Sequence, residues 1–177
     1  MRHFQVLSYQ EEPELVSSWA APVVRDGENE KSSSQKGVWI YNQYWAKMAK
    51  RNFSLTIAVC GVPTFMAIEA ASRLAARGVF VDQLELSTMK PIGAEARAAS
   101  ARKNRKVLTV EEHTIHGGLG SAIAETLALR APTLMRMIGI QDTFAESGDW
   151  AGLMHKYGIS ADHIEPEAIT LSAGEPA

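Results

Sequence analysis

The sequence predicts an α/β protein, a three-layer sandwich in which a mainly parallel sheet lies between two layers of helices. Short apolar and β-branched runs alternate along the chain with segments of helical periodicity. Parallel neighbours need a crossover, usually a helix, so this alternation favours a parallel sheet with helices on both faces. The 177 residues, 46% of them hydrophobic, suffice for one well-buried domain and an extension.

Residues 1–51 are expected to form an N-terminal arm and linker, and residues 52–177 the domain. Residues 25–37 are polar and rich in turn formers, so they cannot bury much apolar surface. Three of the four tryptophans lie in the arm: Trp19, Trp39 and Trp45. Aromatic rings in such an arm need a packing surface, either the domain's own sheet or another chain.

The first half of the domain begins with a predicted buried strand at residues 55–59 (LTIAV). A helix follows, with Thr64 as its N-cap and Gly78 as its stop. Residues 80–86 are the second predicted strand. Another helix should run from Pro91 to about Lys103.

In the second half, residues 106–110 (KVLTV) are the third predicted strand, and a loop and a helix over residues 119–130 follow. Residues 134–140 (LMRMIGI) are the fourth strand. Short helices are expected near residues 149–157 and 161–169. Functional loops of such sheets follow the carboxyl ends of the strands; here these loops begin at Cys60, Ser87, Glu111 and Gln141.

Composition argues against several classes of function. A formal net charge of −2 provides no charge-driven attraction to nucleic acid or to an anionic membrane. The single cysteine, Cys60, allows neither an internal disulfide nor a cysteine-based zinc site, and it points to a reducing setting. The sequence contains no signal-peptide pattern and no apolar run long enough for a bilayer. We therefore expect a cytoplasmic protein with no nucleic-acid or membrane partner.

A glycine-rich turn precedes the predicted helix at residues 119–130. Gly117, Gly118, Gly120 and Ser121 could present N–H groups to an anion, as helix starts do. The spacing matches neither the dinucleotide motif, since Ile123 takes the third glycine's place, nor a Walker A loop. Glycine also suits a tight strand-to-helix corner. The structural corner is the favoured interpretation, and a bound anion or an approaching partner backbone stays open.

Two carboxylates and two histidines come directly before that turn: Glu111, Glu112, His113 and His116. A carboxylate beside an imidazole suits acid/base chemistry, which makes Glu112, His113 and His116 catalytic candidates. No H-E-x-x-H pattern or nearby third histidine is present, so no metal site is predicted. An assembly interface would select the same residue types. The favoured interpretation places Glu111, Glu112 and His113 in such an interface or in a hydrogen-bonded corner.

The loop at residues 142–148 (DTFAESG) carries Phe144, an aromatic residue expected to be exposed and to belong to the same interface. Its sequence is not the G-x-S-x-G of a nucleophile elbow. Ser147 or Asp149 is expected to cap the following helix. Cys60 is expected to pack as a small hydrophobe rather than act as a nucleophile.

Three blocks of sequence resemble the transketolase C-terminal domain. Residues 54–92 share its strand, small-residue turn, alanine-rich helix and Lys-Pro-Ile/Leu corner. KVLTVEEHTIHGGLGSAIAE is similar to its T-V-E-E-H…G-G-L-G-S-A-x-A-E segment. MIGIQDTFAESGDWAGLMHKYGISADHI is similar to its G-I-x-D-x-F-x-E-S-G…L-x-x-K-Y-G-L-T-x-x-x-I ending. The blocks occur in the family's order and span about residues 53–170.

The resemblance implies one component of a split enzyme that carries out two-carbon ketol transfer. In this family two other domains bind thiamine pyrophosphate and Mg²⁺, one through the diphosphate and one through the pyrimidine. The chain would therefore bind no cofactor itself, and partner chains would bring it in a homo- or hetero-oligomer. Its own role would be assembly and shaping of the active-site entrance, and the isolated chain would be inactive.

Residues 6–16 (VLSYQEEPELV) are similar to the tail of the pyrimidine-binding domain, L-S-R-Q-x-x-P. Tyr9 stands where relatives carry an arginine that helps to hold a sugar phosphate, and tyrosine supplies no permanent cation. Residues 32–37 (SSSQKG) also depart from the family's F-x-I-G-K-G. Two alternatives stay open: a regulatory module whose Gly117–Ser121 turn binds an anion or nucleotide, and a degenerate fragment that self-associates through an open apolar patch.

Overall fold

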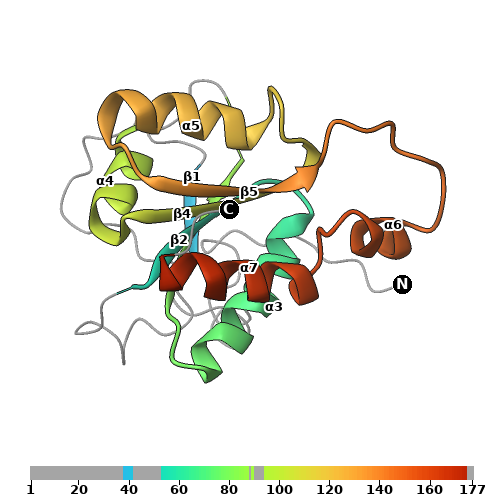
Figure 1. Cartoon of the computed structure of the whole chain (residues 1–177), viewed down its shortest axis with the longest axis horizontal. Helices are drawn as coiled ribbons and strands as arrows, with labels where there is room; N and C mark the ends of the chain where they lie inside the picture. Colours follow the sequence, from blue (N-terminus) through green and yellow to red (C-terminus); the bar gives the residue numbers. More distant parts are fainter. Residues whose placement is uncertain (1–37, 42–52, 88, 90–93, 175–177) are drawn as a thin grey trace, which may run out of the picture.

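The structure is a computed structural model that describes residues 38–41, 53–87, 89 and 94–174. Strands and helices alternate from β2 to β5, as the sequence predicts (Figure 1). The elements in chain order are β1 (Val38–Tyr41), β2 (Leu55–Val59), α3 (Pro63–Ala76), β3 (Val81–Leu86), α4 (Ala94–Asn104), β4 (Lys106–Thr114), α5 (Leu119–Arg130), β5 (Leu134–Ile140), α6 (Trp150–Lys156) and α7 (Ala161–Ala173).

The sheet has five strands in the order β1-β3-β2-β4-β5. Strands β3, β2, β4 and β5 pair in parallel, whereas β1 runs antiparallel to β3 at one edge. The prediction of a mainly parallel sheet is confirmed. Strand β1 falls inside the predicted arm and was not expected from the sequence. Tyr9, Trp19 and Trp45 lie outside the described residues, so the division after residue 51 stays a prediction.

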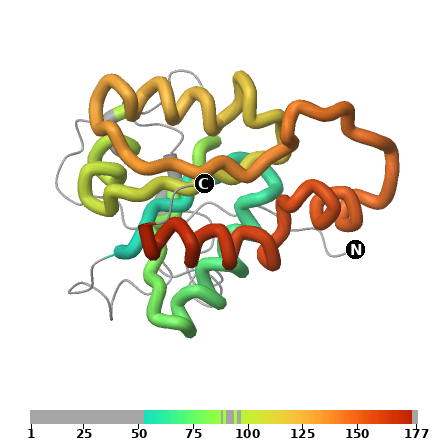
Figure 2. Tube along the Cα trace, in the orientation of Figure 1, coloured from blue at the N-terminus to red at the C-terminus, as the bar shows by residue number. Residues whose placement is uncertain are grey.

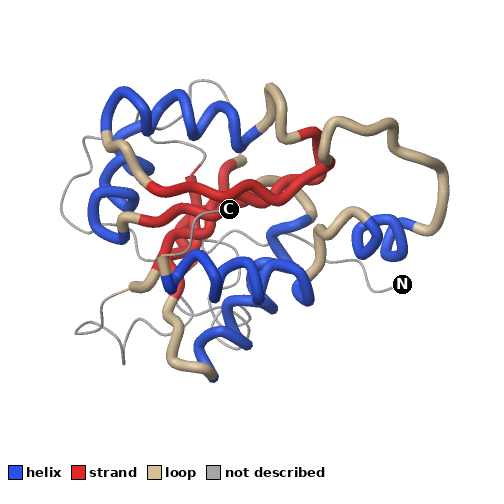
Figure 3. Tube along the Cα trace, viewed as in Figure 1, coloured by secondary structure: helices blue, strands red, loops and turns tan. Residues whose placement is uncertain are grey.

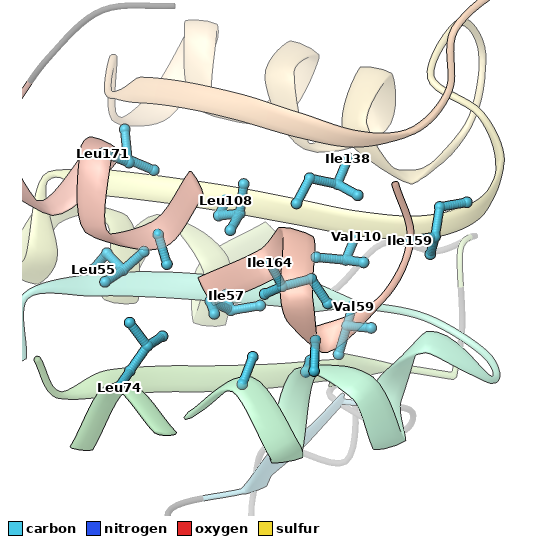
Figure 4. Close-up of a cluster of buried hydrophobic side chains, with 14 of the residues drawn as sticks. Leu55, Ile57, Val59, Leu74, Leu108, Val110, Ile138, Ile159, Ile164 and Leu171 are labelled. Atoms are coloured by element: carbon cyan, nitrogen blue, oxygen red, sulfur yellow. The ribbon is translucent and has the colours of Figure 1, made fainter. Parts of the chain in front are cut away.

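Helices α3 and α7 cover one face of the sheet, and α4 and α5 cover the other (Figure 3). Side chains alternate between the two faces along a strand. Strand β2 therefore directs Ile57 and Val59 toward α3 and α7, and Ala58 toward α4 and α5. Figure 4 shows the first of these clusters, in which the side chains of β2 and β4 meet Leu74 of α3 and Ile164 of α7. Burial on both faces explains why the central strands are continuously apolar.

Several element ends differ from the prediction. Helix α3 begins at Pro63 rather than after a Thr64 cap, because proline suits the first helical position; Thr64 is buried inside the helix. Helix α7 continues to Ala173 and ends at Gly174, whose φ of 89° provides the left-handed stop. Strand β4 continues to Thr114, because its pairing with β5 resumes there after a register shift. Residues 111–113 therefore belong to a strand and not to a loop.

The loop between β5 and α6 carries the chain away from the sheet before α6 and α7 bring it back (Figure 2). It leaves from the carboxyl edge of the sheet, the edge at which the parallel strands end. Among the described residues, no helix has the length and apolar character needed to cross a bilayer.

Leu108→Ala is expected to lower the free energy of unfolding by about 3 kcal/mol, because Leu108 is fully buried in the cluster of Figure 4 and its loss leaves a cavity. Leu129→Ala is the matched control, since Leu129 is 88% exposed, and its effect should stay within about 0.5 kcal/mol. Urea unfolding followed by circular dichroism measures both. Equal effects would contradict the place of Leu108 in the core.

Candidate functional site

The carboxylate of Glu111 lies inside the domain and caps helix α5. Its Oε2 accepts a hydrogen bond from the backbone N–H of Leu119 at 2.6 Å, and its Oε1 accepts one from Gly120 at 2.8 Å. The first N–H groups of a helix have no intrahelical acceptor and favour negative charge. Only 1% of Glu111 is exposed. Glu111, predicted as an interface residue, is thus engaged with its own chain.

The glycines of the turn are required by close contacts with this carboxylate and with β5. A Cβ atom at Gly118 would collide with Oε2 of Glu111. A Cβ atom at Gly120 would lie 2.7 Å from Sδ of Met137 and 3.0 Å from Oγ1 of Thr109. Gly117 adopts a φ of 78°, which other residues rarely accept. These contacts support the favoured interpretation of the segment as a structural corner.

The N–H groups that could have bound an anion at this corner are already bonded to protein groups. Besides the two bonds to Glu111, the N–H of Gly117 donates to Oγ of Ser121 at 2.9 Å, and that hydroxyl donates to the carbonyl of Ile115 at 2.8 Å. An incoming anion would have to displace the Glu111 carboxylate and would be repelled by its charge. We therefore place no anion at this turn.

The candidate acid/base residues lie on the surface beyond Glu111. Oε1 of Glu112 accepts a hydrogen bond from Nε1 of Trp150 at 3.1 Å. Nδ1 of His113 lies 3.2 Å from the carbonyl oxygen of Thr114, and His116 is exposed at the turn. Among the described contacts, neither histidine is paired with a carboxylate. The catalytic role considered for these residues therefore stays a prediction.

The described residues also contain no group of three or more His, Cys, Asp or Glu side chains that could hold a metal ion. A helix start can bind a diphosphate, but the start of α5 is occupied by Glu111 and is not open to the diphosphate of thiamine pyrophosphate.

The loop after β5 is fixed at several points although its residues are exposed. Oδ2 of Asp149 accepts a hydrogen bond from the N–H of Gly152 at 2.9 Å and caps α6, so Asp149 rather than Ser147 is the capping residue. Glu146 forms an ion pair with Lys156, and this ammonium lowers the pKa of the Glu146 carboxyl. Phe144 lies within this fixed loop with its ring entirely exposed.

Cys60 directly follows β2, and Glu85 lies on the neighbouring strand β3, so both lie near the carboxyl edge. Burial raises the pKa of the Cys60 thiol to about 11, and the nearby carboxylates of Glu111 and Glu85 add to the shift. Burial also raises the pKa of Glu85. Cys60 packs against the cluster that contains Ala58 and Leu119, which agrees with the packing role expected from the sequence.

Most of the exposed large hydrophobic side chains among the described residues lie in the loops and helix starts that follow the strands; Leu129 and Leu134 lie elsewhere. Val62 and Phe65 lie at the start of α3, and Met89 follows β3. Phe144 and Trp150 follow β5. We call these five residues the apolar edge. The sequence pattern indicated only Phe144, because the others occur at positions whose helical or strand pattern is equally compatible with burial.

The chain matches the family model described as "Transketolase, C-terminal domain" over residues 45–164. It is 33% identical over 161 residues to the 6-deoxy-6-sulfo-D-fructose transketolase subunit SqwH of Clostridium sp. (strain MSTE9), and the match covers 90% of this chain and 47% of that protein. It is 34% identical over 115 residues to a subunit of the apulose-4-phosphate transketolase of Phocaeicola vulgatus, covering 65% of this chain and 36% of that protein.

Among solved structures, the chain is similar to a split-gene transketolase described as an inactive beta4 tetramer. The TM-score is 0.66 and the identity 35%, over 70% of this chain and 40% of that one. The chain thus spans less than half the length of each of these three relatives.

Glu111→Gln is expected to lower the free energy of unfolding by about 2 kcal/mol. One of the two acceptor oxygens becomes an NH₂ group, which cannot accept the hydrogen bond of the backbone N–H that it faces. Glu112→Gln is the control, since Glu112 is exposed, and should change stability much less. Urea denaturation measures both variants, and hydrogen exchange reports whether the amides of residues 119 and 120 open faster. If Glu111→Gln is as mild as its control, Glu111 does not cap α5 in solution.

Cys60 is expected to react with dithiobis(nitrobenzoate) at pH 8 about tenfold more slowly than in the urea-unfolded chain. A thiol with a pKa of about 11 is almost fully protonated at that pH, and only the thiolate attacks. Raising the pH to 10 should accelerate the reaction of the folded chain. A folded-state rate at pH 8 equal to that of the unfolded chain would show an accessible, ionised thiol instead.

Proposed function

This chain belongs to the transketolase C-terminal domain family, and from that premise we propose that it is the C-terminal, assembly-directing component of a split thiamine-dependent enzyme. The assembled enzyme would transfer two-carbon ketol units. Relatives named as transketolase subunits support this proposal. The apolar edge is the observation that carries it.

The proposed division of labour rests on the family to which the chain belongs and on the corner before α5. The start of α5 is occupied by Glu111 and is not open to a diphosphate. In the proposed complex, thiamine pyrophosphate and Mg²⁺ are held by partner chains that carry the diphosphate-binding and pyrimidine-binding domains. This chain would supply the binding surface and shape the entrance to the active site.

The apolar edge has the chemistry of an assembly surface. Large apolar side chains left in water mark interaction sites, and aromatic residues dominate binding energy at interfaces. Phe144 is presented by a loop that is already fixed by the Asp149 cap and by the Glu146–Lys156 ion pair. The hydrogen bond from Trp150 to Glu112 ties the loop to β4. Little ordering is left to occur on binding, which favours affinity.

The expected partner contacts this edge with a complementary apolar surface. Phe144 and Trp150 would act as anchors, and Glu112 and His113 would lie at the polar rim, where charged groups set orientation more than affinity. This assignment keeps the interface role expected of Glu112, His113 and Phe144. It assigns Glu111 a structural role instead, because this residue is buried and holds the start of α5 in place beneath the surface.

The test is reconstitution with chains that carry the two cofactor-binding domains. The isolated chain is expected to bind no thiamine pyrophosphate and to transfer no ketol units, whereas the mixture should form a complex and become active. Phe144→Ala should weaken assembly about tenfold or more while the melting temperature is unchanged, because an exposed ring contributes nothing to the fold. Light scattering and a coupled ketol-transfer assay measure these outcomes.

Leu129→Ala is the matched control for Phe144→Ala. Leu129 is also an exposed apolar residue, but it lies near the end of α5, away from the carboxyl edge. The Leu129→Ala variant should assemble with the partner chains as strongly as the natural chain does. Ketol transfer by the isolated chain, or equal weakening by both variants, would overturn the proposal.

A further inference from the structure

Within the described part of the chain, Arg97 is a buried cation without a hydrogen-bond partner. Only 2% of the residue is exposed. In the described structure none of its three guanidinium nitrogens has a hydrogen-bond partner. Burial lowers the pKa of Arg97 to about 10, so the group still carries its charge at neutral pH. A buried, unpaired charge is strongly unfavourable, and proteins ordinarily give such a group an anion.

Among the described side chains around α4, the acidic and polar groups form no hydrogen bond with Arg97. Asp82, on β3, accepts hydrogen bonds from Ser100 at 2.7 Å and from Asn104 at 3.2 Å, both on α4. Thr56 of β2 joins the same network through Ser100 and Asn104. This network lies toward the amino ends of β2 and β3, one or two turns further along α4 than Arg97. The guanidinium is left outside it.

The position of Arg97 points to the start of α4. It is the fourth residue of the helix, and helical side chains lean toward the helix N-terminus. The N–H groups of a first helical turn have no intrahelical acceptor and carry partial positive charge. Because α4 runs back from the carboxyl edge, its start lies at that edge. A buried guanidinium and a helix start thus share one small region.

We propose that Arg97 and the start of α4 form a binding site for a phosphate group. A guanidinium offers a fork of donors that matches two phosphate oxygens, and the helix start supplies further donors for the others. A phosphate there would remove the unpaired charge. Arg97 and the start of α4 would bind inorganic phosphate or the phosphate of a small phosphorylated metabolite, because the phosphate group itself is what they recognise.

Access to the site depends on the first turn of α4. Ser100 and Asn104 hold the later turns of the helix to β2 and β3, and the buried apolar side chains of α4, Ala98 and Ala101, are small. Small buried areas permit local opening at low free energy. A displacement of the first turn would admit the ion, and the bound ion would then hold that turn in place. The site would couple phosphate to the order of α4, independently of any role of this chain in a larger enzyme.

Thermal unfolding of the full chain tests the proposal without any partner chain. Sodium phosphate, compared with sodium chloride at equal ionic strength, is expected to raise the melting temperature by about 4 °C at a concentration tenfold above the dissociation constant. Glycerol 3-phosphate forms a second arm: a larger shift than with phosphate identifies a phosphorylated metabolite, and an equal or smaller shift identifies the free ion.

Arg97→Met is expected to melt at a higher temperature than the natural chain in phosphate-free buffer, because it removes the unpaired charge, and to lose the response to phosphate. Arg97→Lys keeps the positive charge but loses the paired donors of the guanidinium, so phosphate should raise its melting temperature less than that of the natural chain. Arg102→Met is the matched control, since Arg102 lies on the same helix but is exposed, and should respond like the natural chain.

Three outcomes would overturn the proposal. The natural chain could show no shift beyond that in chloride, or Arg97→Met could respond as the natural chain does. Arg97→Met could also melt lower in phosphate-free buffer, which would show that Arg97 already has a partner. If Arg97→Met does not fold, titration calorimetry of phosphate into the natural chain decides, since no heat of binding contradicts the site. The assay needs no reconstituted enzyme, so its failure and that of the proposed function are separate.

Discussion

The buried carboxylate of Glu111 is the contact on which the functional edge of this domain depends. It joins the end of β4 to the first turn of α5 through two charge-assisted hydrogen bonds. Its side chain also packs beside β5, where a Cβ atom at Gly139 would lie 3.1 Å from its Cγ. A carboxylate can be buried here because the helix start supplies both donors and positive potential. The neighbouring glycines leave room for it.

This constraint decides what the edge can do. A strand-to-helix corner with free N–H groups is a common anion site in α/β proteins, but here the protein's own carboxylate takes that place. The groups that remain available to another molecule lie further out, at Glu112 and in the loop after β5, which is tied to Glu112 by the hydrogen bond from Trp150. A surface of fixed loops and exposed aromatic rings is better suited to recognising another protein than to moving protons. The assembly role is consistent with this distribution of polar and apolar groups.

The elements that depend on local sequence were predictable, and those that depend on distant pairing were not. Helix α5 and strand β5 have the bounds that periodicity and flanking residues indicate. The extension of β4 depends on pairing with β5 across a register shift, which periodicity does not encode. Strand β1 needs β3 as its partner. At the site, Phe144 was found from its loop composition, whereas Trp150 contacts Glu112 across 38 positions and left no local signal.

The two unusual features of the domain follow one physical argument. Phe144 is a large apolar ring in water, and Arg97 is a charge in the interior. Both placements are unfavourable in the isolated chain. Phe144 lacks an apolar surface to pack against, and Arg97 lacks a hydrogen-bonded anion among the described residues. Both lie on elements that begin or end at the carboxyl edge, α4 for Arg97 and the loop after β5 for Phe144. Glu111 satisfies the helix start at the corner between them from within the domain. The partner surface proposed for Phe144 and the phosphate proposed for Arg97 would remove the two unfavourable placements.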